Sequence, residues 1–134
     1  MFLEMLNDEQ KKLFLHLAVL AANANNIVDD AERDMLIHFA REMNIDPIIS
    51  SDKQVDEITD ALRQISGNTE RKVILFELVG IMFSDTQCDE METAFLNEVA
   101  TKLSVSNADI SKMIGLVKDY IDLYNKIFDT VIRE

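Results

Sequence analysis

Two short acidic segments of this chain carry residue types that can bind a metal ion. Asp85, Asp89 and Glu92 lie close together in one segment, and Asp29 with Glu32 repeats the last two acids in the other. Carboxylate oxygens are ligands that Ca²⁺ and Mg²⁺ prefer. The spacing differs from that of an EF-hand, which places acids at alternate loop positions. These five residues form the candidate divalent-cation site, with Asp29 and Glu32 joining it if the two segments meet.

Helix capping explains the same acids without a metal, and it is the interpretation that we favour. Asp29 with Glu32, and Asp89 with Glu92, have the spacing of capping boxes, in which each side chain accepts a backbone N–H at the helix start. On this interpretation Asp85 ends the preceding helix and faces water. Two further pairs predict the same box at other helix starts: Asn7 with Gln10, and Ser51 with Gln54.

Four other residues have side chains that can do chemistry. Glu77 interrupts the apolar run Val73–Phe83, and a carboxylate inside a bundle must be paired, bind a metal or carry a raised pKa. We expect instead that Glu77 lies on a narrow exposed stripe. For His16 we expect a backbone carbonyl partner, with Glu77 as the alternative, and we expect His38 at the surface. Acidic neighbours oppose a thiolate at Cys88, which favours a small apolar role.

The elements that position these residues are two copies of one helical unit, sixty residues apart. A nearly all-apolar run precedes each acidic segment, over residues 13–22 and 73–83. After each segment, apolar residues recur at i, i+1, i+4, i+5 and i+8, which is one face of a helix. The two sets are Met35, Leu36, Phe39, Ala40 and Met43, and Phe95, Leu96, Val99, Ala100 and Leu103. The repeats, approximately 7–45 and 69–105, each predict a helix-loop-helix, and together a pseudo-two-fold bundle.

A third, short helix is predicted between the two repeats. It has one apolar face, made by Val55, Ile58, Leu62 and Ile65. Pro47 is expected to end the helix before it, because the residue preceding a proline is disfavoured in the α region. Gly67 is expected to close the third helix.

The last predicted helix, approximately 107–133, is too long for the rest of the fold. Apolar residues from Ile110 to Val131 recur at alternating steps of three and four. Residues 106–134 would extend about 42 Å as a continuous helix, more than a domain of this size is wide. The helix must therefore wrap, break near Gly115 or project. We expect the stripe to face the core, with a helix–helix seam as the alternative.

Composition bounds the class of protein. The chain has 134 residues, 13 basic and 25 acidic, for a net charge of −12. The length indicates a single domain over residues 1–134. The small number of turn-forming residues favours an all-α bundle of about six or seven helices. The excess of acid argues against nucleic acid and favours basic protein partners. One cysteine excludes an internal disulfide, and the absence of an export signal or membrane-length apolar run predicts a cytoplasmic protein.

The doubled acidic segment resembles the tellurite-resistance TerB family, an all-helical bacterial domain also similar to part of a membrane-anchored DnaJ-type co-chaperone. The family pattern is a helix ending in Ala-Asp-Gly, two residues, an Asp or Ser, two more residues and a Glu. The first segment matches it with Asn25 and Asn26 in place of Asp-Gly. The second keeps the acid as Asp85 and has Thr86 in place of the glycine. The resemblance extends from about residue 7 to residue 106.

The resemblance implies a helical bundle, a role in bacterial stress and metal-oxyanion resistance, and a divalent-cation site among the loop acids, without catalysis. We therefore expect a non-enzymatic interaction protein, with weak binding of Ca²⁺ or Mg²⁺ by the loop acids as the alternative to capping and with no other cofactor. One alternative is a metal-dependent or acid–base enzyme that uses Asp85, Asp89 and Glu77. A second alternative is a structural module that forms a homodimer through the helix from Met113 to Val131.

Overall fold

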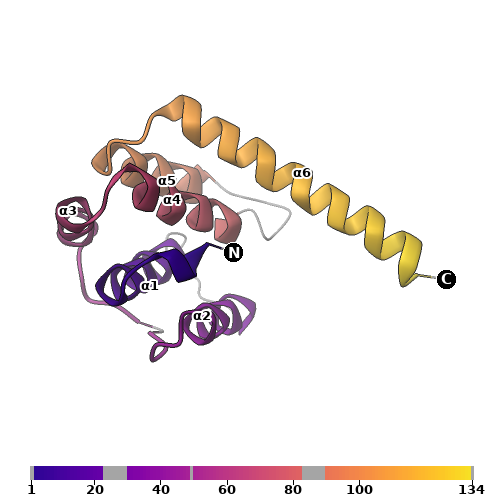
Figure 1. Cartoon of the computed structure of the whole chain (residues 1–134), viewed down its shortest axis with the longest axis horizontal. Helices are drawn as coiled ribbons and strands as arrows, with labels where there is room; N and C mark the ends of the chain where they lie inside the picture. The colour runs from indigo at the N-terminus through magenta and orange to yellow at the C-terminus, as the bar shows by residue number, and fades with distance from the viewer. Residues whose placement is uncertain (1, 23–29, 49, 83–89, 134) are drawn as a thin grey trace.

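The computed structural model describes residues 2–22, 30–48, 50–82 and 90–133, without the side chains of residues 31, 32, 91 and 92. Within these ranges the chain forms six α-helices and a short 3-10 helix and no β-strand, which confirms the predicted all-α bundle. The elements in Figure 1 are η1 (Leu3–Met5), α1 (Asp8–Ala22), α2 (Asp30–Met43), α3 (Val55–Ile65), α4 (Asn68–Met82), α5 (Glu90–Lys102) and α6 (Asn107–Val131).

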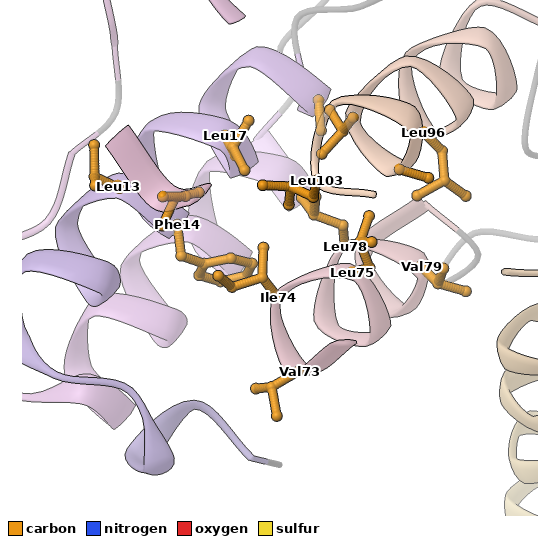
Figure 2. Close-up of a cluster of buried hydrophobic side chains, with 14 of the residues drawn as sticks. Leu13, Phe14, Leu17, Val73, Ile74, Leu75, Leu78, Val79, Leu96 and Leu103 are labelled. Atoms are coloured by element: carbon orange, nitrogen blue, oxygen red, sulfur yellow. The ribbon is translucent and has the colours of Figure 1, made fainter. Parts of the chain in front are cut away.

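The helices α1 and α4 lie side by side at the centre of the bundle. α1 also packs against α2 and α3, and α4 packs against α5 and α6. Both central helices are buried around most of their circumference, as their nearly all-apolar sequences predict. Figure 2 shows the resulting core, with Phe14 and Leu17 of α1 facing Ile74, Leu75 and Leu78 of α4.

The sixty-residue repeat is visible in the backbone. α1 and α4 have the same length and begin sixty residues apart. α2 and α5 also begin sixty residues apart. Asn44 and Ser104, also sixty residues apart, both adopt positive φ, at 56° and 60°. At each site the positive-φ residue donates its N–H to a carbonyl three residues back, and the next residue donates five residues back. This is the Schellman arrangement that ends a helix.

Three predictions about helix ends are wrong. α2 ends at Met43 and is followed by the left-handed residue Asn44, so Pro47 lies beyond the helix and does not end it. The cap of α3 is Gln54, which forms a box with Glu57, so the predicted box of Ser51 with Gln54 does not form. Gly67 follows Ser66, the C-cap of α3, but does not adopt the positive φ of a closing glycine. The carbonyl of Gly67 instead accepts the N–H of Arg71 at the start of α4.

Two other predicted local features are confirmed. Asn7 and Gln10 form the expected capping box, with N–H to side-chain oxygen distances of 2.9 and 2.8 Å. The predicted apolar face of α3 is turned inward, because Ile58 and Leu62 are fully buried. The buried side chain of Gln10 also donates to the carbonyl of Ile65, which ties the start of α1 to the end of α3.

The helix α6 is continuous through Gly115 and projects from the bundle (Figure 1). It starts at Ser106, whose hydroxyl accepts the N–H of Asp109 at 3.1 Å. Its first half packs against α4 and α5 and buries Ile110 and Val117. Of the three options left by the length of this helix, the structure therefore adopts projection. No helix in the described ranges is both long and apolar enough to cross a bilayer.

Candidate interaction surface

The side chains of all five residues of the predicted cation site lie outside the described structure. Asp29, Asp85 and Asp89 are not among the described residues, and the side chains of Glu32 and Glu92 are not described either. Both the cation site and the capping boxes at these positions therefore stay predictions. Among the side chains that are described, no group of three or more His, Cys, Asp or Glu residues could hold a metal ion.

The structure corrects the prediction for Glu77, which is buried with 7% of its surface exposed. The N-terminal segment packs across α4 at this point. The backbone N–H of Phe2 donates to Glu77 Oε1 at 2.8 Å, and the Phe2 ring lies 6.0 Å from that of Phe76. The stripe of α4 that carries Glu77 is thus covered by a segment 75 residues earlier in the chain.

Of the two histidines, His16 is half-buried and His38 is exposed. His16 Nδ1 lies 2.6 Å from the hydroxyl of Ser51, so the expected carbonyl partner is wrong and the partner is a side chain of the α2–α3 connection. Burial and, to a lesser extent, the nearby Lys53 lower the pKa of His16 below its ordinary value. His38 is exposed, as expected, and Cys88 lies outside the described residues.

A polar pocket of about 240 Å³ lies where the start of α4 meets the turn between α5 and α6. Its charged side chains hold helix ends together. The guanidinium of Arg71 donates to the carbonyls of Ser66, Leu103 and Arg63 at 3.1, 3.3 and 2.8 Å. These bonds satisfy the carbonyls at the ends of α3 and α5, which gives the arginine a structural role.

The most exposed apolar surface in the described structure lies on α6 from Leu116 onward. Large apolar side chains there are between 41% and 70% exposed. We call seven of them the distal stripe: Leu116, Tyr120, Leu123, Tyr124, Ile127, Phe128 and Val131. Outside α6 and the residue that follows it, Phe2 and Met5 are the described large apolar side chains that are similarly exposed.

The distal stripe continues the face by which α6 packs on the bundle. Steps of three and four lead from the buried Ile110 and Val117 to Tyr120 and Tyr124. The expectation of a core-facing stripe is therefore right for the first half of α6 and wrong for the second half. The second half extends past the helices that would cover it (Figure 1).

The area of the distal stripe is large for an uncovered surface. Side chains of this size have areas of roughly 150–250 Å², so seven that are about half exposed present on the order of 700 Å². The largest apolar patch of a typical monomer is about 300–600 Å², and larger patches mark interaction sites. The distal stripe is therefore the candidate functional surface of this chain.

The charges around the distal stripe balance. Residues 118–133 contain three basic side chains, Lys118, Lys126 and Arg133, and three acidic ones, Asp119, Asp122 and Asp129. The net charge of this segment is zero, so residues 1–117 carry −11 of the total of −12 and Glu134 carries the remaining −1. The molecule thus combines an acidic bundle with a neutral, apolar projection.

The sequence pattern showed the apolar face of α6 but not its exposure. The alternation of three and four residues missed Leu116, Leu123 and Phe128, which widen the face on both sides. Three apolar residues beside a three–four seam were the signal that could have identified a broad binding face. Compared with protein-family models, curated protein sequences and solved structures, the chain matches none.

Proposed function

We propose that this chain is a non-enzymatic, TerB-like interaction protein of the bacterial cytoplasm, which acts in a stress response of the tellurite- or metal-resistance type and binds protein through the distal stripe. The observation that carries the interaction role is the uncovered apolar face of α6, from Leu116 to Val131. The TerB-like part is supported by the repeated acidic segments and by the helices that recur around them at the same offset.

A protein partner suits the distal stripe better than a lipid surface. Helices that lie on anionic membranes carry an excess of Lys and Arg on their polar face. The polar face here has as many acids as bases, and the bundle behind it is strongly acidic. That acidic bundle also attracts basic protein partners and cations over a long range. We therefore assign the apolar contact to α6 and the electrostatic attraction to the bundle.

A site-specific photo-crosslinker tests the interaction role. We would place p-benzoylphenylalanine at Leu123, on the distal stripe, and at Asn125 of the same helix as the matched control, in cells that produce the protein. Light should give protein adducts from position 123 and few from position 125. Absence of adducts at 123, or equal adducts at both positions, would contradict the proposal.

Weak binding of Ca²⁺ or Mg²⁺ through the acidic segments is the second part of the proposal. It is supported by Asp85, Asp89 and Glu92, with Asp29 and Glu32, which supply hard oxygen ligands in two short segments. Titration calorimetry with each cation should give heat that is lost in Asp85→Ala and Asp89→Asn. Wild-type protein that gives no heat, or variants that still bind fully, would contradict this part and leave the interaction role to its own test.

A further inference from the structure

We propose that the occupant of the distal stripe is a second copy of this chain, with the two α6 helices packed side by side and antiparallel. This inference rests on the proposed role of α6 as an interaction surface. It adds the identity of the partner and the geometry of the complex.

The exposed area fits a self-complementary dimer. Each copy offers on the order of 700 Å² of apolar surface, and partners in a standard protein interface each bury about 800 Å². The stripe is several side chains wide, which suits helix–helix packing by ridges into grooves. Tyr120 and Tyr124 lie near its middle, where large aromatic side chains contribute most to interfaces.

The charge distribution favours self-association at this place on the molecule. Two chains of charge −12 repel each other wherever their acidic bundles approach. The segment 118–133 has no net charge, so two copies can meet there without that repulsion. A basic partner, in contrast, would be drawn to the acidic bundle and would find no complementary charge on the distal stripe.

Repulsion between the acidic bundles also favours the antiparallel arrangement. In a parallel pair the two acidic bundles would lie at the same end and face each other. In an antiparallel pair they lie at opposite ends of a segment about 24 Å long, at 1.5 Å per residue over sixteen residues. Charges separated by more than about 8 Å are largely screened at physiological ionic strength. The antiparallel dimer therefore avoids most of the repulsion.

The mass of the purified protein tests self-association. Light scattering at about 50 μM should give twice the chain mass of 15.3 kDa. Interfaces of this size reach dissociation constants in the micromolar range or tighter, so the dimer should predominate at this concentration. Ile127→Asp should weaken the dimer about 100-fold or more, because a two-fold interface contains the substituted residue twice, once from each copy. Asn125→Asp, which adds the same charge to the polar side of α6, should leave the mass unchanged.

Folding of both variants is checked by circular dichroism, and Ile127 is 53% exposed, so the bundle does not need it. Wild-type protein that stays at the chain mass up to about 100 μM would overturn the inference, since that concentration exceeds what a standard interface needs. Equal weakening by Asn125→Asp would overturn it as well, because the contact would then not involve the distal stripe.

Cysteine pairs test the orientation, in a Cys88→Ala background. If the helices are antiparallel about the middle of the stripe, residue 116 of one copy lies near residue 130 of the other. A mixture of Leu116→Cys and Thr130→Cys proteins should then form the mixed disulfide, while each protein oxidised by itself forms little dimer. Disulfide dimers from each single variant, without the mixed species, would contradict the antiparallel arrangement.

The crosslinking result separates the two proposals. Adducts at position 123 with the mass of a second copy support both of them. Adducts only with a different protein would leave the interaction role standing and overturn the inference that the partner is a second copy. Absence of adducts would contradict both.

Discussion

The two left-handed residues Asn44 and Ser104 allow a stability prediction with matched sites. Each follows the last turn of its helix at positive φ, and each is exposed. A left-handed backbone costs an L-residue about 1–2 kcal/mol, and Asn less because its side chain tolerates it. Glycine avoids that cost but gives the unfolded chain about 0.5–1 kcal/mol more conformational freedom. Ser104→Gly should therefore stabilise the protein by about 0.5–1 kcal/mol, and Asn44→Gly by less.

Thermal unfolding measures this difference. Globular proteins unfold with an entropy of about 2.1 cal/mol/K per residue, or about 280 cal/mol/K for 134 residues. Ser104→Gly should then raise Tm by about 2–4 °C. Asn44→Gly should raise it by about 1 °C. The order of the two variants matters more than either value, because both sites share the same hydrogen-bond pattern.

Two controls isolate the backbone effect. Ser104→Ala removes the hydroxyl and keeps the left-handed strain, so its Tm should stay close to that of the wild type. Ser111→Gly places glycine inside α6 at an exposed position and should destabilise the protein by about 0.5–1 kcal/mol. If Ser104→Gly lowered Tm, or if Ser111→Gly raised it equally, backbone strain at these helix ends would not be the cause.

Three further changes test the packing of the bundle. Arg71→Lys should lower the free energy of unfolding by about 1–2 kcal/mol in urea, because an ammonium group cannot span the three carbonyls that the guanidinium binds; an unchanged midpoint would contradict this role. Leu15→Ala and Leu75→Ala, at equivalent and fully buried positions of the repeat, should each cost about 3 kcal/mol, and a large difference between them would mean that the two halves pack unequally. The lowered pKa of His16 means that the unfolded state binds more protons below pH 6.5, so this group destabilises the fold as pH falls from 7 to 5. The stability of His16→Gln relative to the wild type should rise over that range, and a constant difference would refute the linkage.

The architecture was predictable where burial follows local periodicity. The all-apolar runs marked α1 and α4 as central helices, and the spacing of Ile58 and Leu62 gave the buried face of α3. Helix ends were less predictable. Pro47 is a strong local signal, but the hydrogen bonds around Asn44 end α2 before the proline is reached.

Contacts between distant segments were not predictable from the sequence. Glu77 interrupts an apolar run, so we expected the side of α4 that carries it to be exposed. Nothing near it in the chain indicated that the N-terminal segment covers that side. The exposure of Tyr124 and Ile127 was hidden for the same reason, because periodicity identifies an apolar face without showing what lies against it. The length of α6 indicated only that the helix must wrap, break or project, and the structure selects projection.

The projecting half of α6 has a consequence for the local dynamics of the chain. A helix of about 15 residues without tertiary contacts is only marginally stable in water. The amide protons of residues 118–131 should therefore exchange with solvent through fraying, without unfolding of α1 or α4. Any molecule that covers these residues also slows that fraying. In the proposed dimer, association and helix formation at the C-terminal turns are therefore one equilibrium, and dilution should loosen those turns while the bundle stays folded.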